Sequence, residues 1–284
     1  MTLTLSTAQI LGLGAVAGLT IFIGLPIGRM HGLDAWLKCF LSSTATGILL
    51  FLLWDVLSNA VDPIDASLHA HRWGRFAELS TLGAVGFTGG MMSLVYYDAW
   101  MKRRADRRTT TLVGPGAAAV DEFVERQRLD LTNPAVRLAF LIAIGIGVHN
   151  FGEGLAIGQS AAADEVSLAL VLIIGFALHN ATEGFGIVGP MSGEAERPSW
   201  GFLGLMGLIG GGPTFVGTVV GQAWVSEALE VAFFAVAAGS ILYVVIQLFD
   251  VCRRYAIPVV VAWWILAGIV VGFGTDFILV AAGA

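Results

Sequence analysis

Two copies of one polar motif lie in apolar surroundings, and they are the residues best suited to chemistry. The first copy is His149-Asn150-Phe151-Gly152-Glu153-Gly154, and the second is His179-Asn180-Ala181-Thr182-Glu183-Gly184. Both read H-N-x-x-E-G, and the second begins 30 residues after the first. Imidazole, carboxylate and amide groups in this pattern can bind a divalent cation, relay protons or hold a metal that activates water.

Helix geometry brings the polar groups of each copy to one side. At 3.6 residues per turn, His149 and Glu153 lie about 40° apart on one face, and Asn150 lies about 60° from Glu153. The Gly after each Glu leaves room for a close neighbouring helix. Two such helices that face each other would gather two imidazoles, two carboxylates and two amides. The candidate metal ligands are therefore His149, Asn150, Glu153, His179, Asn180 and Glu183.

Burying these groups in hydrocarbon favours a bound cation. An ionisable side chain at mid-membrane costs roughly 2.5–3.5 kcal/mol on insertion scales. No Lys or Arg lies in the core of either apolar run to balance the two Glu residues. Imidazole and carboxylate without thiolate suit Zn²⁺, Fe²⁺, Mn²⁺, Co²⁺ or Ni²⁺ rather than Cu⁺. Two alternatives remain open, a proton relay and a membrane-embedded metalloenzyme, although the chain has no H-E-x-x-H and no acid or base outside the doubled motif to support an enzyme.

The composition is that of an integral membrane protein. Of 284 residues, 56% are hydrophobic and 13% are charged, whereas about 25% would be charged in a soluble domain. About 20 apolar residues span a bilayer, and eight segments qualify. We therefore predict one all-α domain over residues 1–284, a bundle of eight transmembrane helices. The predicted spans are 8–28, 35–59, 76–100, 135–160, 166–189, 200–223, 228–249 and 257–282.

Basic residues predict the orientation in the membrane. Eight spans put both termini on one side, and with the termini outside thirteen basic residues fall at inner loops and helix ends. Only Arg72 and Arg75 fall outside, so the positive-inside rule places both termini outside the cytoplasm. The one long loop, 101–134, is then cytoplasmic, and Asn133-Pro134 is a start signal for the fourth span.

Three further features carry weaker predictions. The outer loop 60–75 holds His69 and His71, which could capture metal but fit a solvated polar loop better. Cys39 and Cys252 have neither metal-site nor disulfide spacing, so we expect small apolar fillers at helix ends. A similarity between Ala45–Phe51 and Ala237–Tyr243 places Asp55 opposite Gln247. Such repeats suggest inverted halves around a doubled centre, a 3+2+3 arrangement, with Asp55 and Gln247 on a transport pathway.

At these residues the chain resembles the ZIP (ZRT/IRT-like) family of divalent-metal transporters, especially its prokaryotic branch. Members of that family have eight spans, outside termini and an H-N-x-P-E-G motif in span four, with a related motif in span five. Residues 86–98 resemble the family's third span, which ends in an Asp, and residues 234–250 resemble its seventh. The resemblance implies that the two motifs supply the metal ligands. It also implies an elevator-like movement of spans one, four, five and six against the other four.

The chain departs from the family pattern at several positions. The motif proline is replaced by Gly152 and Thr182, and Gly212 stands before Pro213 where many members have Glu-Pro in span six. Gln247 and Asn180 occupy places where the family often has an acid. Fewer negative charges favour one metal position, centred on Glu153 and Glu183 and completed by His149 and His179.

The sequence thus predicts a multi-pass protein of the plasma membrane, the inner membrane in a bacterium. We expect it to carry a divalent transition metal, zinc first, into the cytoplasm through an intramembrane His/Glu/Asn site. The metal is substrate rather than prosthetic group. The expected partners are the metal ion and the lipid bilayer, with no nucleic acid, and the small-residue spans would allow a homodimer.

Overall fold

The computed structural model consists of helices joined by short connections. It describes residues 6–30, 35–111, 133–162, 166–191, 197–224 and 226–282, without the side chains of 35, 105–111, 166–168, 171, 172, 178, 179, 278–280 and 282. The helices in chain order are α1 (Thr7–Leu19), α2 (Ile21–Gly24), η1 (Leu25–Arg29), α3 (Ala35–His69), α4 (Trp73–Thr111), α6 (Pro134–Ala162), α7 (Val166–Val188), η2 (Gly189–Met191), α8 (Trp200–Ala223), α9 (Glu227–Arg253) and α10 (Pro258–Ala282). The described part of the chain is therefore all-helical, as predicted.

Each predicted span corresponds to a helical segment. Seven helical segments of the described chain are long and apolar enough to cross a membrane, and α7, with 23 residues, occupies the remaining predicted span. The first span is interrupted at Thr20, so that α1, α2 and η1 follow one another over Thr7–Arg29. These findings support a multi-pass membrane protein.

Two predicted loops are partly helical. The outer loop 60–75 is a continuation of α3, which runs through Pro63 to His69 before α4 begins at Trp73. The long loop 101–134 is helical as far as Thr111, and residues 112–132 lie outside the described chain. Hydropathy finds where the apolar stretch ends, but a helix can continue beyond it when polar residues keep a helical backbone in water.

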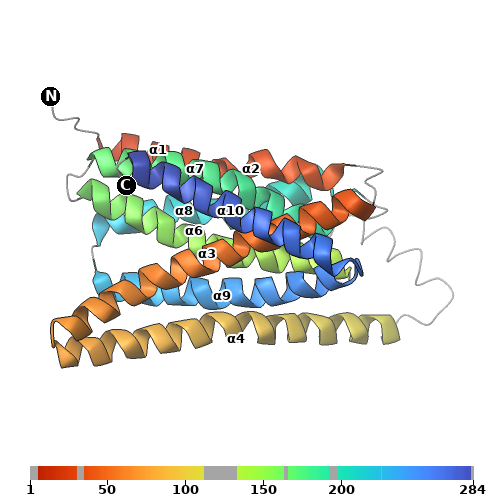
Figure 1. Ribbon diagram of the computed structural model, residues 1–284, viewed down its shortest axis with the longest axis horizontal. Coiled ribbons are helices and arrows are strands. Elements are labelled where there is room, and N and C mark those ends of the chain that lie inside the picture. The colour runs from red at the N-terminus through yellow and green to blue at the C-terminus, as the bar shows by residue number, and fades with distance from the viewer. Residues whose placement is uncertain are drawn as a thin grey trace.

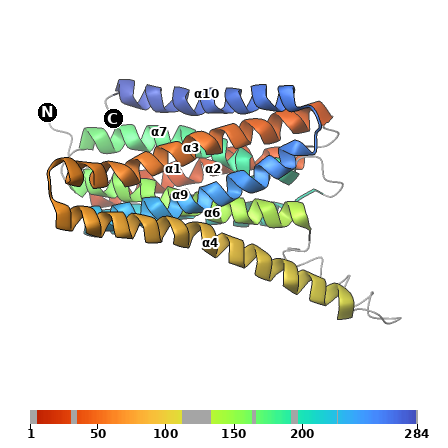
Figure 2. The ribbon, with the colours of Figure 1, turned by 60° about the horizontal axis from the view of Figure 1, so that its bottom comes forward.

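The helices run roughly along the long axis of the molecule (Figure 1). The start of α1 and the end of α10 lie at the same end of the bundle, where the α3–α4 connection also lies. This placement fits an even number of spans. Figure 2 shows α10 along one edge and α4 along the opposite edge, with the motif helices α6 and α7 between them.

The central helices pack against one another around buried apolar side chains. Helix α6 packs chiefly on α8, and α7 packs on α1, α2 and α3. The largest buried apolar cluster takes side chains from most of the helices, and a smaller one joins α1, α6 and α7 through Ile10, Ala17, Ile157 and Ile173. The two motif segments are thus held in the interior of the bundle.

Local caps fix where the motif helix α6 and its neighbour α8 begin. The side-chain oxygen of Asn133 accepts hydrogen bonds from the backbone N–H groups of Ala135 at 2.8 Å and Val136 at 3.4 Å. This confirms Asn133 as the N-cap, with Pro134 in the first helical position. Ser199 caps α8 in the same way through the N–H of Phe202 at 3.0 Å.

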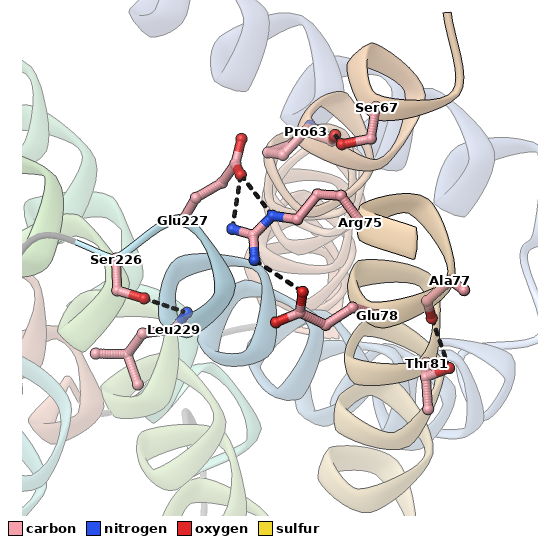
Figure 3. Close-up of polar contacts among 9 residues, drawn as sticks. All are labelled: Pro63, Ser67, Arg75, Ala77, Glu78, Thr81, Ser226, Glu227 and Leu229. Atoms are coloured by element: carbon pink, nitrogen blue, oxygen red, sulfur yellow. Dashed lines mark hydrogen bonds and ion pairs between the residues drawn. The ribbon is translucent and has the colours of Figure 1, made fainter. Parts of the chain in front are cut away.

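Helices α4 and α9 are joined by polar contacts near both of their ends. Near the start of both helices, Arg75 donates to Glu227 at 2.8 Å and to Glu78 at 3.0 Å (Figure 3). Near the other end, the buried Asp98 accepts from the hydroxyl of Tyr243 on α9 at 2.7 Å. The pair of helices is therefore fastened along much of its length.

The Asp98 carboxylate also reaches the motif helix. Arg137, at the start of α6, pairs with it at 2.9 Å, and Lys102 of α4 pairs with it at 2.6 Å. Asp98 is only 4% exposed, and a buried carboxylate of this kind is stable only when it is paired and hydrogen-bonded. The cluster of Asp98, Lys102, Arg137 and Tyr243, called the Asp98 cluster below, links α4, α6 and α9.

Candidate metal site

The two motif copies meet at the contact between α6 and α7. The imidazole nitrogen Nε2 of His149 lies 3.2 Å from Oε1 of Glu153, one turn further along α6. The same nitrogen lies 3.7 Å from Oε1 of Glu183 on α7. The three residues are at most 3% exposed. One imidazole therefore faces a carboxylate from each copy, in surroundings closed to water.

These distances are close to those between ligands that share one metal ion. Nitrogen and oxygen atoms bound to zinc at about 2.0–2.2 Å with tetrahedral angles are about 3.3–3.6 Å apart. The two contacts of His149, at 3.2 Å and 3.7 Å, lie on either side of this range. A divalent cation between these groups would also balance two carboxylates that a single imidazole cannot neutralise.

Asn150 orients the second carboxylate. Its amide nitrogen donates to Oε2 of Glu183 at 3.0 Å and to the backbone carbonyl of Gly210 on α8, also at 3.0 Å. Both amide protons are thereby used, and the position of Glu183 relative to α6 is fixed. A partner of this kind sets the direction in which a ligand presents its remaining oxygen to a metal.

Three buried oxygen atoms of the motifs accept no hydrogen bond from any described residue. They are Oδ1 of Asn150, Oε2 of Glu153 and Oδ1 of Asn180. Buried polar atoms in proteins almost always have a partner. Oxygen atoms with free lone pairs, on the same two segments that carry the imidazole and carboxylates, are donors that a cation could occupy.

Asn180 holds the second copy against the first span. Its amide nitrogen donates to the carbonyl of Ala17 at 3.0 Å, and Asn180 is fully buried. The carbonyl of Ala17 also accepts from the hydroxyl of Thr20, at the interruption between α1 and α2. The two motif asparagines thus play matching parts, each donating to a backbone carbonyl of a flanking helix.

The motif glycines make matching contacts as well. A Cβ at Gly154 would collide with the carbonyl of Thr214 on α8, and a Cβ at Gly184 would collide with the carbonyl of Ile21 on α2. Both positions are therefore restricted to glycine by close backbone approach. The prediction that these glycines admit a close neighbouring helix is confirmed.

The structure shows less of the other predicted residues, His179, Asp55 and Gln247. The side chain of His179 lies outside what the structure describes, so its place relative to His149 stays a prediction. Asp55 on α3 is partly buried, bonds to Asn59, and interacts electrostatically with His149 and Glu153. Gln247 on α9 is partly buried, and its role on a pathway stays a prediction.

Asp276 and the two carbonyl partners of the asparagines were not predicted from the sequence. Asp276 lies on α10 and interacts electrostatically with Asp55. It is the one acidic residue in the last apolar run, and an ionisable group within a span is a signal for function that could have found it. Backbone carbonyls such as those of Ala17 and Gly210 leave no such signal in a sequence.

Metal capture by His69, at the outer end of α3, gains no support from its contacts. His69 is exposed and contacts Asp65 of its own helix at 3.5 Å. Among the described side chains, which do not include His179, no group of three or more His, Cys, Asp or Glu residues has the arrangement of a metal site. Within the motifs, His149 lies close to Glu153 and to Glu183. His179, the fourth predicted ligand, is not among the described side chains.

Comparison with known proteins gives one family match, over the segment that carries both motifs. Residues 124–252 match the model of the family described as ZIP zinc transporter. No curated protein matches the chain. The matched segment contains both motifs and runs from before α6 almost to the end of α9. Over this segment, the chain is similar to the ZIP zinc transporter family.

Proposed function

We propose that the protein carries a divalent transition metal, zinc first, across the membrane and into the cytoplasm through the site between α6 and α7. The observation that carries this proposal is the placement of the His149 imidazole 3.2 Å from Glu153 and 3.7 Å from Glu183, in a buried position. The family match supports metal transport in general. The ligand chemistry narrows the cargo to metals that accept nitrogen and oxygen donors.

The proposed site holds one ion. Glu153 and Glu183 supply the negative charge, His149 supplies a nitrogen, and His179 completes the set. Asn150 holds Glu183 in place, and its free amide oxygen could join the ion. A transporter must release its cargo, and a mixed set of neutral and anionic ligands without thiolate permits release more readily than a closed structural site.

Transport by this site would proceed by movement of one helix group past another. In the proposed elevator, α1, α6, α7 and α8 move against α3, α4, α9 and α10. The matched contacts of the two motif copies with α8 and with α1 and α2 support an inverted arrangement of the moving group. The pair of Arg137 with Asp98 crosses between the groups, so the movement would have to open it.

The proposal also covers the orientation of the protein in the membrane and the path by which the metal reaches the site. The excess of basic residues at one end of the spans predicts termini outside and cargo moving inward, across the inner membrane in a bacterium. Asp55 and Gln247 are proposed to line the pathway. The electrostatic coupling of Asp55 to His149 and Glu153 supports its part, because a carboxylate there would attract cations toward the site.

Uptake by reconstituted vesicles tests the transport proposal. Proteoliposomes would be offered Zn²⁺, Fe²⁺, Mn²⁺, Co²⁺ and Ni²⁺ in parallel, with wild type and Glu153→Gln/Glu183→Gln. We expect saturable uptake of at least zinc by wild type and background flux in the double variant. Glu78→Gln/Glu227→Gln is the matched control, since these two Glu residues lie exposed at the Arg75 contact.

Two outcomes would contradict the proposal. Undiminished flux in Glu153→Gln/Glu183→Gln would remove the site from the transport path. Hydrolytic activity of the purified protein in detergent, lost in Glu153→Ala and without metal flux, would favour the membrane metalloenzyme instead.

The single ion position has a test of its own. Gly212 stands where many ZIP proteins carry the Glu of a Glu-Pro pair, and a Cβ there would meet only Leu208 of the same helix, at 3.4 Å. If the missing carboxylate limits the site to one ion, Gly212→Glu should raise the bound zinc per chain by about one ion, because an added carboxylate balances further positive charge. Elemental analysis after equilibrium dialysis measures this, with Gly212→Gln as the control. An unchanged zinc content would refute this explanation.

A further inference from the structure

The two cysteines of the chain come together although 213 positions separate them. Cys39 lies near the start of α3 and Cys252 near the end of α9, and they are 0% and 1% exposed. The hydroxyl of Ser43 lies 3.9 Å from the sulfur of Cys39 and donates to the sulfur of Cys252 at 3.6 Å. Their spacing in the sequence suggested only apolar fillers, but both thiols share one polar neighbour.

A second hydroxyl completes a set of four donor atoms. Oγ1 of Thr46 lies 3.4 Å from the sulfur of Cys252. Its single proton is directed to the backbone carbonyl of Ser42 at 2.8 Å, which leaves the oxygen lone pairs on the side of the sulfur. Three contacts therefore connect Cys39, Ser43, Cys252 and Thr46 one after another in the protein interior.

The three sulfur–oxygen distances are close to those between neighbouring ligands of one metal ion. With zinc–sulfur bonds of about 2.3 Å and zinc–oxygen bonds of about 2.0–2.2 Å, sulfur and oxygen ligands are about 3.5–3.7 Å apart. The three sulfur–oxygen contacts, at 3.4, 3.6 and 3.9 Å, fall around this range. Without a metal, the same contacts serve as thiol and hydroxyl hydrogen bonds.

A cavity lies beside one of the two cysteines, Cys252. It has a volume of about 370 Å³ and is lined by Cys252 together with residues of α9 and of the start of α10. Arg253 and Ile257, two of the lining residues, are exposed, so the cavity reaches the protein surface. An ion could therefore approach Cys252 from the protein surface.

We propose that Cys39, Cys252, Ser43 and Thr46 form a second metal site, which takes a soft divalent cation of the Zn²⁺ or Cd²⁺ class. On binding, each thiol releases its proton to solvent, and the two thiolates balance the two charges of the ion. Thiolate ligands favour softer metals than the imidazole and carboxylate groups between α6 and α7 do. The site stands apart from the transport proposal and does not depend on it.

Cadmium binding tests the site directly. Purified Glu153→Gln/Glu183→Gln protein, kept reduced, would be titrated with Cd²⁺ while the ultraviolet thiolate-to-cadmium charge-transfer absorption and the bound cadmium per chain are measured. We expect one Cd²⁺ per chain with this absorption, and the loss of both in the same background with Cys39→Ser/Cys252→Ser. Absence of the absorption, or equal bound cadmium in the two proteins, would overturn the proposal.

Further variants separate a site from two unrelated thiols. Ser43→Ala should weaken cadmium binding by about 10-fold or more, as loss of a supporting group at a metal site does. Ser93→Ala is the matched control, because that hydroxyl bonds only to Gly90 of its own helix. Equal affinity in Ser43→Ala and Ser93→Ala, or full affinity in Cys39→Ser alone, would contradict the four-atom site.

Two measurements guard against misfolding and against confusion with transport. Size-exclusion profiles of the cysteine variants, with Cys39→Ala/Cys252→Ala as a second version, must match the parent. Zinc uptake by Cys39→Ser/Cys252→Ser vesicles in the wild-type background should be unchanged. A loss of uptake in well-folded protein would place the thiols on the transport path and overturn the separate site.

Discussion

The two motif copies, one on α6 and one on α7, are held by matching contacts. In each, the asparagine donates to a carbonyl of a flanking helix, Gly210 for Asn150 and Ala17 for Asn180. In each, the glycine after the glutamate lies against a carbonyl four residues further along that flanking segment. The repeated sequence thus produces a repeated set of contacts, although α8 and the first span share no obvious motif.

The flanking helices differ in continuity. Helix α8 runs unbroken from Trp200 to Ala223, although Pro213 lies inside it. The first span is interrupted at Thr20, and the Ala17 carbonyl that meets Asn180 is part of the interruption. The α6 copy is also tied to α4 and α9 through Arg137. In addition, Asn150 donates to Glu183 of the other copy, whereas the amide nitrogen of Asn180 donates to the first span.

This difference suggests that the two motif copies have different roles although their sequences match. The α6 copy sets the geometry of the site, because its asparagine and histidine both reach Glu183 on the other helix. The α7 copy contributes its carboxylate and is anchored to an interrupted helix, where the backbone can adjust. Substitutions in the α6 and α7 copies can show whether the two copies contribute alike to metal binding and stability.

The largest expected effect is the loss of either carboxylate. If one ion is shared by both copies, Glu153→Gln and Glu183→Gln should each reduce zinc uptake by about 100-fold or more, beyond the loss caused by removing a supporting group. The double variant should be little worse than either single one, since both remove the same ion. Initial uptake rates in proteoliposomes measure this. Independent, multiplying losses would indicate two separate sites.

The next effect concerns the anchor that belongs to the α6 copy. Arg137→Gln leaves the buried Asp98 with Lys102 and Tyr243 as partners, and should destabilise the protein by about 3 kcal/mol, the low end for breaking a buried ion pair. Thermal unfolding in detergent measures this. Arg75→Gln, at the exposed ion pair of α4 and α9, is the control and should leave the unfolding temperature unchanged. Equal stability of both variants would show that α6 has no such anchor.

The asparagines should separate the copies most clearly. Asn150→Ala frees Glu183 and should weaken zinc binding by about 10–100-fold. Asn180→Ala should lower stability while leaving zinc affinity less affected, because its amide nitrogen bonds to the first span rather than to a ligand. Isothermal titration with zinc and thermal unfolding of the same samples distinguish the two. Equal losses of affinity would make the copies equivalent at the metal.

The smallest effect should be alike in both copies. Gly154→Ala and Gly184→Ala each force a methyl group onto a neighbouring backbone carbonyl, and overpacking of this kind costs about 1–3 kcal/mol. Gly186→Ala is the matched control, since its methyl group would only approach Ala45 at 4.0 Å. Thermal unfolding reports all three. If Gly154→Ala lowers the unfolding temperature and Gly184→Ala does not, the backbone of the interrupted first span moves to make room for the methyl group.

The helices could be predicted from the sequence better than their ends could. Apolar length located a helical segment for every predicted span, and Asn133 with Pro134 marked the start of α6 because a side-chain cap is a local property. The extension of α3 to His69 and of α4 to Thr111 escaped prediction. Hydropathy measures the apolar stretch, whereas these extensions include polar residues and stay helical beyond it.

The residue types of the candidate site could be predicted from the sequence, but the contacts of these residues could not. The spacing of His149 and Glu153 indicated one helix face, and the doubled motif indicated a partner helix. The partners of Asn150 and Asn180 are backbone carbonyls of distant segments, and the meeting of Cys39 with Cys252 depends on the packing of α3 on α9. Such contacts arise from tertiary packing and leave no local pattern.

The central claim is that one metal ion lies between the two motif copies. Anomalous diffraction at the zinc absorption edge, from crystals of the zinc-loaded protein, tests it most directly. We expect a peak between α6 and α7 within about 2.0–2.2 Å of His149 Nε2 and of oxygen atoms from Glu153 and Glu183. A structure without a peak there, in which these side chains contact only one another and Asn150, would contradict the claim.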